Sequence, residues 1–296
     1  MKILFVINQK SGVQAENTLE DEIKKIAELS GFEYQIYHIK KNAESDIKRL
    51  LNEYKPDRVA AAGGDGTVNL LAGILFYSGI PLLIIPSGSA NGMAKELEIS
   101  NIEQALSLLQ DGDIKSIDLI RINGIISIHL ADIGVNARVV KRFEEDSRRG
   151  IMTYARHLFG EMFLMKHYRF YITYDGKSIK RKAVSITFAN ASRYGTGAVI
   201  NPHGKLDDGF FELIIVKPFP DIQIFSIAWK MFRNKLHTSD YVEVISCKEA
   251  KLKCSRRTTL QVDGEVIGKV KDFHIEMMHN ALKVLVPKNS QDNKVS

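Results

Sequence analysis

The hydrophobic pattern of this chain changes character near residue 112. Up to that point, short apolar runs alternate with longer segments in which apolar residues recur at helical spacing. The runs predict buried strands, and the longer segments predict amphipathic helices. Strand and helix in regular alternation favour a parallel sheet with helices on both faces. The expected strands are 2–8, 34–39, 58–62 and 82–85, and the expected helices are 16–29, 43–54, 67–77 and 102–109.

Beyond residue 112 the pattern is that of short strands joined by tight turns. The dipeptides Asn123-Gly124 and Asp175-Gly176 are of the kind favoured in two-residue hairpin turns. This part is therefore predicted to be antiparallel and β-rich, a sandwich or a barrel with a few inserted helices. The expected strands are 115–122, 125–130, 168–174, 178–190, 210–216, 241–246, 258–262, 266–271, 273–278 and 281–286, and the expected helices are 136–145, 151–166 and 221–232.

Length and composition fit this division into two soluble domains. With 296 residues, 45% of them hydrophobic and 26% charged, the chain can form two domains with sizeable cores. We expect an α/β domain over 1–120, a β-rich domain over 121–286, and a polar tail over 287–296 that could pack back on the first domain. The formal net charge of +6 favours acidic partners, namely nucleic acid, nucleotide or an anionic membrane surface, without choosing among them.

The sequence also predicts a cytoplasmic protein. No stretch approaches the roughly 18 continuous apolar residues of a membrane span. Polar residues from Asn8 onward make the N-terminus a first strand rather than a signal peptide. The two cysteines, Cys247 and Cys254, are too few for a disulfide scaffold, and we expect them to be reduced and structural.

Three glycine-containing turns follow expected parallel strands. They are Asn8-Gln-Lys-Ser-Gly12, Gly63-Gly-Asp-Gly-Thr-Val-Asn69 and Pro86-Ser-Gly-Ser-Ala-Asn91. Glycines let the backbone approach an anion closely, and a helix that begins there offers unpaired N–H groups and the positive end of its dipole. Because ligands of such sheets bind beyond the carboxyl ends of the strands, the three turns predict a phosphate site. Its candidate residues are Asn8, Ser11, Gly12, Gly63, Gly64, Asp65, Gly66, Thr67, Asn69, Gly88 and Ser89.

Asp65 adds a cation to this prediction. A carboxylate that faces phosphates repels them unless a cation lies between, so Asp65 indicates a Mg²⁺–nucleotide site. One Gly-Asp-Gly turn alone could be an ordinary strand–helix connection. The turn is neither a P-loop nor a Gly-x-Gly-x-x-Gly fingerprint, since Asn69 stands where the last glycine of that fingerprint would be.

Five motifs, in order along nearly the whole chain, resemble the diacylglycerol kinase catalytic-domain family in its branch of bacterial soluble lipid kinases. This branch is related to the sphingosine and ceramide kinases and to NAD kinase. The motifs are the three glycine turns together with Lys205-Leu-Asp-Asp-Gly209 and Val262-Asp-Gly-Glu265. The resemblance implies an α/β N-terminal nucleotide-binding domain with a parallel sheet, and a β-rich, antiparallel, sandwich-like C-terminal domain. It also implies ATP bound between the two domains and a lipid hydroxyl as the acceptor.

The resemblance assigns roles to residues that would otherwise look ordinary. Glu265 becomes the general base that takes the proton of the attacking hydroxyl, and Asp65 the residue that organises Mg²⁺ and the phosphates. Without the resemblance, Asp263-Gly264 is a hairpin turn and Glu265 a solvated strand residue. By the same resemblance, a structural Mg²⁺ site in the second domain takes the Asp208 carboxylate, with Asp207 and the Leu206 carbonyl nearby; otherwise this stretch is a solvated loop.

Of three departures from the family pattern, the one at Asn136 leaves the acceptor open. Asn136 stands where many members have aspartate, Gln9 replaces a proline, and Ser89 replaces a threonine. The favoured reaction converts diacylglycerol to phosphatidic acid. The alternatives are a kinase of another lipid alcohol, such as a sphingoid base or a monoacylglycerol, and a nucleotide-binding regulatory protein without turnover.

The partners are predicted from the same features. Apolar residues at helical spacing over 151–165, with basic residues on or before them, could be a core-packing helix or a surface that docks on anionic lipid. We expect peripheral attachment to a membrane, no nucleic-acid partner, and a homodimer if an edge strand of the second domain pairs two chains.

Overall fold

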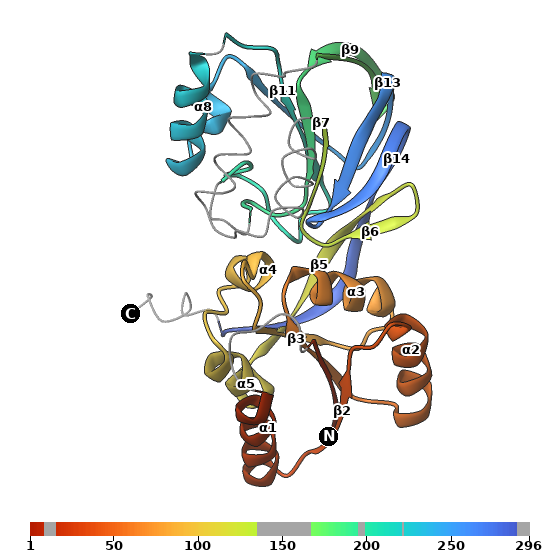
Figure 1. Cartoon of the computed structure of the whole chain (residues 1–296), viewed down its shortest axis with the longest axis vertical. Coiled ribbons are helices and arrows are strands. Elements are labelled where there is room, and N and C mark those ends of the chain that lie inside the picture. Colours follow the sequence, from red (N-terminus) through yellow and green to blue (C-terminus); the bar gives the residue numbers. More distant parts are fainter. Residues whose placement is uncertain (9–15, 135–166, 195–198, 221, 289–296) are drawn as a thin grey trace. The chain divides into compact units, whose positions relative to one another are not determined.

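The computed structural model describes residues 1–8, 16–134, 167–194, 199–220 and 222–288. The chain forms two compact units (Figure 1). The first unit consists of Met1–Ile117 together with the chain from Asn280 onward, and the second is Asp118–His279. The helices expected over 136–145 and 151–166, including the predicted docking helix, lie outside the described residues.

The first unit is built on a parallel sheet, as the alternating pattern predicted. Its strands lie in the order β2-β1-β3-β4-β14, and each neighbouring pair is parallel. The residues of β1 from Ile3 to Val6 are completely buried, because a strand covered on both faces has no polar side. The strands are β1 (Lys2–Ile7), β2 (Glu33–His38), β3 (Arg58–Gly63), β4 (Leu82–Pro86) and the end of β14 (Glu265–Val286).

Helices cover both faces of this sheet. Figure 1 shows α1 and α5 on one side of it and α2 and α3 on the other. The helices are α1 (Glu16–Ser30), α2 (Ala43–Tyr54), α3 (Asp65–Leu75), α4 (Gly92–Glu96) and α5 (Ile102–Asp111). The expected helices are confirmed with shifts of a few residues at their ends. Helix α3 is shifted by two residues at both ends and begins two residues before Thr67, directly within the glycine turn.

The second unit is an antiparallel β-structure in which β13 belongs to two groups of strands. Through Ala250–Cys254 it pairs with β8, and through Leu260–Val262 it pairs with β7, with a register shift in between. One group has the order β12-β11-β10-β7-β13, and the other contains β9, β8, β13 and β14, with β5 beside β14 and β6 beside β5. The strands are β5 (Asp113–Ile122), β6 (Ile125–Ser127), β7 (Leu130–Gly134), β8 (Tyr168–Tyr174), β9 (Lys177–Ala183), β10 (Ser185–Ala189), β11 (Phe211–Val216), β12 (Val242–Cys247) and β13 (Glu249–Val262).

The larger of two described apolar clusters in this unit draws on both groups of strands. Phe170 of β8, Phe188 of β10 and Phe273 of β14 all belong to it, and the ring centroids of Phe188 and Phe273 are 6.3 Å apart. Both cysteines are part of this core and are free. Burial raises the pKa of the Cys247 thiol to about 12, which keeps it protonated and unreactive. The prediction of reduced, structural cysteines is confirmed.

The predicted two-residue turns are confirmed by their backbone angles. Asn123 and Asp175 have φ values of 49° and 44°, and the glycines that follow them have φ values of 88° and 78°. Two successive positive φ angles define a type I′ turn, whose twist matches that of the flanking strands. The sequence could predict these turns because few residue pairs accept such angles.

Five of the expected strands differ from the structure. The expected strand 178–190 is two strands, since β9 ends at Ala183 and β10 begins at Ser185. The expected strand 125–130 is interrupted after Ser127, because the backbone N–H groups of residues 128–130 donate to the Asp263 carboxylate. The three strands expected between 266 and 286 are one continuous strand, β14, because its polar residues, such as Asp272, lie at exposed positions. Helix α8 (Gln223–Phe232) and a short 3₁₀ turn, η2 (Leu236–Thr238), complete this unit.

The compact units divide the chain differently from the expected boundaries at residues 120 and 286. Strand β5 begins in the first unit and ends in the second, and β14 returns from the second unit to the first at Asn280. The end of β14 pairs there with β4, Val284 lying opposite Leu82. Tail residues 289–296 lie outside the described part of the chain.

Candidate functional site

The three predicted glycine turns begin at one edge of the first unit's sheet. Gly63 at the end of β3 lies opposite Pro86 at the end of β4. The backbone N of Asn8, just after β1, donates to the carbonyl oxygen of Ala62 at 2.9 Å. The carboxyl ends of these parallel strands therefore come together, as the sequence predicted. Ser11 and Gly12 of the first turn lie outside the described residues.

Two of the turns are in direct contact through glycine backbone. A Cβ atom added at Gly88 would lie 2.9 Å from the backbone N of Gly64 and closer still to its Cα. No side chain fits in this space without moving backbone. Gly64 precedes the first turn of α3, where helix N–H groups have no acceptor within the helix. The close approach thus brings a second loop against a helix N-terminus that can bind an anion.

Side chains fix the Pro86–Asn91 turn in place. Asn91 has a left-handed backbone, with φ at 51°, and both ends of its amide bind Gly88: Oδ1 accepts from the backbone N at 2.9 Å, and Nδ2 donates to the carbonyl oxygen at 2.8 Å. Asp65 accepts from the next two backbone N–H groups, Gly92 at 3.0 Å and Met93 at 3.1 Å. Asp65 therefore joins the first helix start to the second.

The remaining predicted residues of this unit lie around the same edge. Asn8 Nδ2 donates to Thr67 Oγ1 at 3.2 Å, which ties the end of β1 to the first turn of α3. Thr67 is buried, Asn69 is half-buried, and Ser89 is exposed. The structure therefore brings the described members of the predicted phosphate site to one edge of the sheet.

Replacing Gly88 by alanine is expected to separate these two turns. Overpacking of this kind costs about 1–3 kcal/mol in the free energy of unfolding. Gly73, within α3, is the matched control, because a Cβ there meets nothing within 4 Å. Gly73→Ala should leave stability unchanged or raise it by about 0.5–1 kcal/mol. Urea unfolding tests this, and a Gly88→Ala protein as stable as wild type would contradict the contact.

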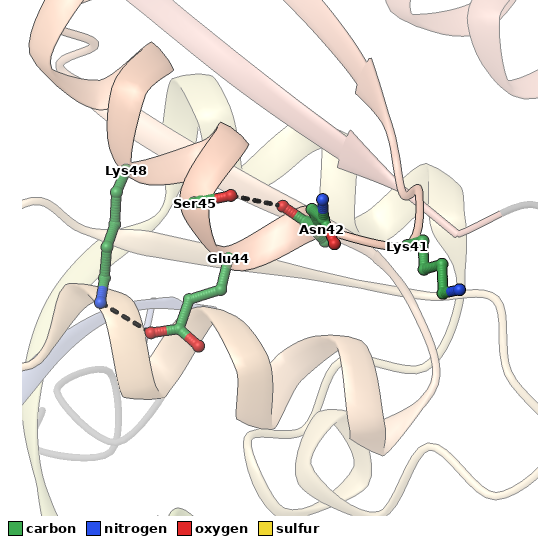
Figure 2. A pocket seen from close by; sticks show the side chains of 6 residues that line it. Lys41, Asn42, Glu44, Ser45 and Lys48 are labelled. Carbon is green, nitrogen blue, oxygen red and sulfur yellow. Dashed lines mark hydrogen bonds and ion pairs between the residues drawn. The ribbon is translucent and has the colours of Figure 1, made fainter.

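The first unit also has a shallow pocket of about 340 Å³ at the start of α2 (Figure 2). Its polar side chains are engaged locally: Lys48 Nζ donates to Glu44 Oε1 at 2.7 Å, and Ser45 Oγ donates to the Asn42 carbonyl oxygen at 3.0 Å. None of the predicted site residues lines it. We assign it no function.

In the second unit, the predicted general base Glu265 is exposed, whereas Asp263, two residues before it, is buried. Val262 pairs with Glu265 across a type I′ turn, in which Asp263 has a φ of 47° and Gly264 a φ of 93°. The Glu265 side chain is exposed. Asp263 is buried and accepts hydrogen bonds from the successive backbone N–H groups of residues 128–130 at 2.9–3.0 Å and from Ser127 Oγ at 2.9 Å. These bonds explain why the strand expected over 125–130 is interrupted between β6 and β7.

Asp263 is a structural residue that the sequence analysis assigned only to a turn. Burial raises the pKa of its carboxyl above the ordinary value, while the positive potential of His129 and the hydrogen bonds of residues 127–130 oppose the shift. The signal in the sequence was the Asp-Gly pair. Nothing in that pair distinguishes a buried aspartate from the exposed Asp175 of the other hairpin.

The predicted metal residues of the second unit lie near a buried aspartate that the sequence analysis did not single out. Asp118 accepts from Gly209 N at 2.6 Å, its Oδ1 lies 2.8 Å from His279 Nδ1, and its backbone N donates to the Leu206 carbonyl oxygen at 2.6 Å. Asp208 Oδ1 accepts from the backbone N of Phe210 at 3.0 Å. Within the described ranges, no group of three or more acidic, histidine or cysteine side chains is placed to hold a metal. The site at Leu206, Asp207 and Asp208 stays a prediction.

A second buried carboxylate group was also missed. Asp132 on β7 accepts from Thr187, from Tyr194 Oη at 2.9 Å and from Gln261 Nε2 at 2.7 Å. Thr187 and Gln261 lie directly opposite it on the neighbouring strands. The partners are up to 129 residues apart in the chain, so no local pattern could have shown them.

Comparison with known proteins covers both parts of the chain. Residues 2–122 match the family described as the diacylglycerol kinase catalytic domain, and residues 130–286 match the YegS C-terminal NAD kinase beta sandwich-like domain. A diacylglycerol kinase from Staphylococcus aureus (strain bovine RF122) is 30% identical over 276 residues, which cover 90% of this chain and 86% of that protein. The match of each half to its own family confirms the predicted fold class.

Two further comparisons differ in how much of the other protein they cover. An uncharacterized protein from Synechocystis is 27% identical over 242 residues, which cover 77% of this chain but only 54% of that protein. A crystal structure of a diacylglycerol kinase from Bacillus anthracis has a TM-score of 0.77 and 20% sequence identity, and covers 97% of both chains. At that identity the similarity shows a shared fold.

Proposed function

We propose, from the premise that this chain belongs to the diacylglycerol kinase family, that it transfers the γ-phosphate of Mg-ATP to the free hydroxyl of diacylglycerol and so forms phosphatidic acid. The family makes the chain a lipid kinase of the diacylglycerol kinase type. The nucleotide, the metal and the acceptor are part of the proposal. The observation that carries it is the contact between Gly64 and Gly88 at the start of α3.

This contact supports phosphate binding because it is made of backbone. A chain of phosphates needs N–H donors in a concave surface, and glycines leave those donors accessible. Asn8 and Thr67 add side-chain oxygen and nitrogen atoms at the same edge. Phosphoryl transfer demands mainly positioning and charge neutralisation, so a rigid cradle of this kind accounts for much of what the nucleotide side must do.

The carboxylate oxygens of Asp65 are suited to bind the Mg²⁺ of a nucleotide. Each carboxylate oxygen of Asp65 accepts one backbone N–H and retains a lone pair for a further partner. Mg²⁺ is held in nucleotide sites by one or two carboxylates together with phosphate oxygens and water, and it neutralises charge on the phosphates. Asp65 itself holds the two helix starts together, so its substitution should weaken both their alignment and Mg-ATP use.

On the acceptor side we assign Glu265 as the general base. An exposed carboxylate on a rigid type I′ turn can accept the proton of a lipid hydroxyl as that oxygen attacks phosphorus. The stretch Leu206–Asp208 would hold a second, structural Mg²⁺ through the Asp208 carboxylate and nearby carbonyl oxygens, and Asp207 lies beside them. The Leu206 carbonyl already accepts one hydrogen bond and has a second lone pair.

Two other functions compete with this one. The same chemistry could act on a sphingoid base or a monoacylglycerol, and the fold could serve nucleotide-dependent regulation without turnover. Incubation of the purified protein with labelled ATP, Mg²⁺ and each lipid alcohol in neutral-detergent micelles separates all three. We expect label in phosphatidic acid. Label in another lipid would mean that this lipid, and not diacylglycerol, is the acceptor. ATP binding without any labelled lipid would reject the proposal that the protein is a lipid kinase.

A further inference from the structure

Helix α8 and the turn that follows it have an unusual composition. From Ile222 to Ser239 there is no aspartate or glutamate, while Lys230, Arg233 and Lys235 are basic and half of the segment is apolar. Such a mixture is typical of helices that lie in the interface of an anionic membrane. No helix in the described part of the chain is long and apolar enough to cross a bilayer.

The inner side of α8 holds the helix on the second unit. Ile227 is buried in a cluster with Ile214 of β11 and Val242 of β12, and Met231, one turn further along, packs against the same cluster. Figure 1 shows the helix beside β11. These contacts fix which side of the helix is available to a partner, because residues three or four apart share a face.

The opposite side of α8 exposes large apolar groups that the core does not use. Ile222, just before the helix, is 73% exposed, and Trp229 is 56% exposed. Ser226 and Arg233 complete the same stripe, at intervals of three or four residues. Tryptophan is favoured where one side of a residue is apolar and the other wet, and is enriched at membrane interfaces.

Basic groups border this stripe. The Arg233 guanidinium lies over the Trp229 ring, 5.6 Å from its centroid, and the exposed Lys235 follows two residues later. Lys230 Nζ donates to the Thr238 carbonyl oxygen at 3.0 Å, an acceptor that leaves its charge uncompensated. A surface that pairs an exposed tryptophan with several cations suits lipid phosphates. It does not suit a second copy of itself, since like charges would face each other.

We propose that α8 is a peripheral membrane anchor, with Trp229 and Ile222 entering the headgroup boundary of an anionic phospholipid bilayer and Arg233 and Lys235 binding lipid phosphates. This inference rests on the proposed function, because a kinase of diacylglycerol must reach an acceptor that resides in a bilayer. It places the docking surface on a different segment from the helix predicted over 151–166.

Trp229 is the only tryptophan of the chain and therefore reports on this surface directly. The full-length protein is titrated with vesicles of phosphatidylcholine and phosphatidylglycerol (7:3), without ATP or diacylglycerol. Tryptophan emission should shift to shorter wavelength and be quenched by brominated phospholipid, while pure phosphatidylcholine vesicles should have little effect. Added salt should reverse the shift. Emission that is unchanged on binding, or that shifts with protein concentration in the absence of vesicles, would overturn the proposal, the latter as self-association.

Charge-reversal variants show whether vesicle binding depends on this surface or only on the net charge of the protein. Each basic residue near an anionic surface contributes roughly a fivefold increase in partitioning, so Arg233→Glu with Lys235→Glu should weaken vesicle binding by about 25-fold or more. Lys24→Glu with Lys25→Glu makes the same charge change on exposed positions of α1 and should have a much smaller effect. Equal losses in the two double variants would reject α8 as the anchor.

The result of the vesicle-binding experiment does not depend on the result of the kinase assay. Vesicle binding needs neither nucleotide nor acceptor, so a wild-type protein that phosphorylates no lipid would refute the proposed function and leave the binding result standing. In neutral-detergent micelles the Arg233→Glu, Lys235→Glu protein should retain wild-type activity. Loss of activity there, with vesicle binding intact, would contradict a role confined to docking.

Discussion

Replacement of Glu265 by glutamine is expected to lower turnover by about 10²–10⁴-fold, while ATP still binds and the protein remains as stable as wild type. The rate effect is that of removing a positioned general base. The stability effect should stay within about 0.5 kcal/mol, because the Glu265 side chain is exposed and the turn that carries it is fixed by the backbone angles of Asp263 and Gly264. Initial rates with diacylglycerol in micelles, ATP titration and urea unfolding measure the three quantities.

A matched variant shows whether the loss of turnover is specific to Glu265 or follows from removing any exposed carboxylate. Glu103→Gln removes an exposed carboxylate from α5 in the other unit and should leave turnover unchanged. Glu265→Asp keeps the base but shortens its reach, and should retain more activity than Glu265→Gln. Near-normal turnover of Glu265→Gln would mean that the proton leaves by another route.

The elements of the fold were largely predictable from local patterns, and the reasons are physical. Buried parallel strands require continuous apolar runs, and type I′ turns require residues that tolerate two positive φ angles, as Asn123-Gly124 does. The extent of β14 was not predictable in this way. Its interior polar residues, such as Asp272, resemble strand ends in the sequence but lie on an exposed face.

In the candidate site, too, local sequence patterns predicted the turns but not the contacts between distant residues. The glycine turns could be predicted because each lies within a few residues of a strand end, and their convergence follows from a parallel sheet. The partners of Asp65 could not, since it binds backbone groups 27 and 28 residues away. A carboxylate that was interpreted only as a cation ligand also fixes the start of a second helix, and a short pattern does not contain that information.

Replacement of Asp263 by alanine should be among the most destabilising single changes in the second unit. The carboxylate accepts three backbone N–H groups and the Ser127 hydroxyl in a buried position, and alanine leaves these donors without an acceptor. Each buried donor left unpaired costs about 1–3 kcal/mol, so the total loss should be several kcal/mol, a large part of the stability of a typical domain. Urea unfolding measured against wild type gives this difference.

The other Asp-Gly turn supplies the control for this prediction. Asp175 has nearly the same left-handed backbone as Asp263, with φ at 44° against 47°, but its side chain is exposed. Among the described residues its side chain makes one long contact, of 3.4 Å, with the backbone N of Lys248. Alanine at either position introduces the same backbone strain, so the difference between the two variants isolates the buried hydrogen bonds. Similar losses of stability in both would show that turn conformation, rather than the Asp263 carboxylate, holds residues 127–130. A large loss in Asp263→Ala alone would show that the buried carboxylate, and not the turn conformation that both sites share, holds residues 127–130 in place.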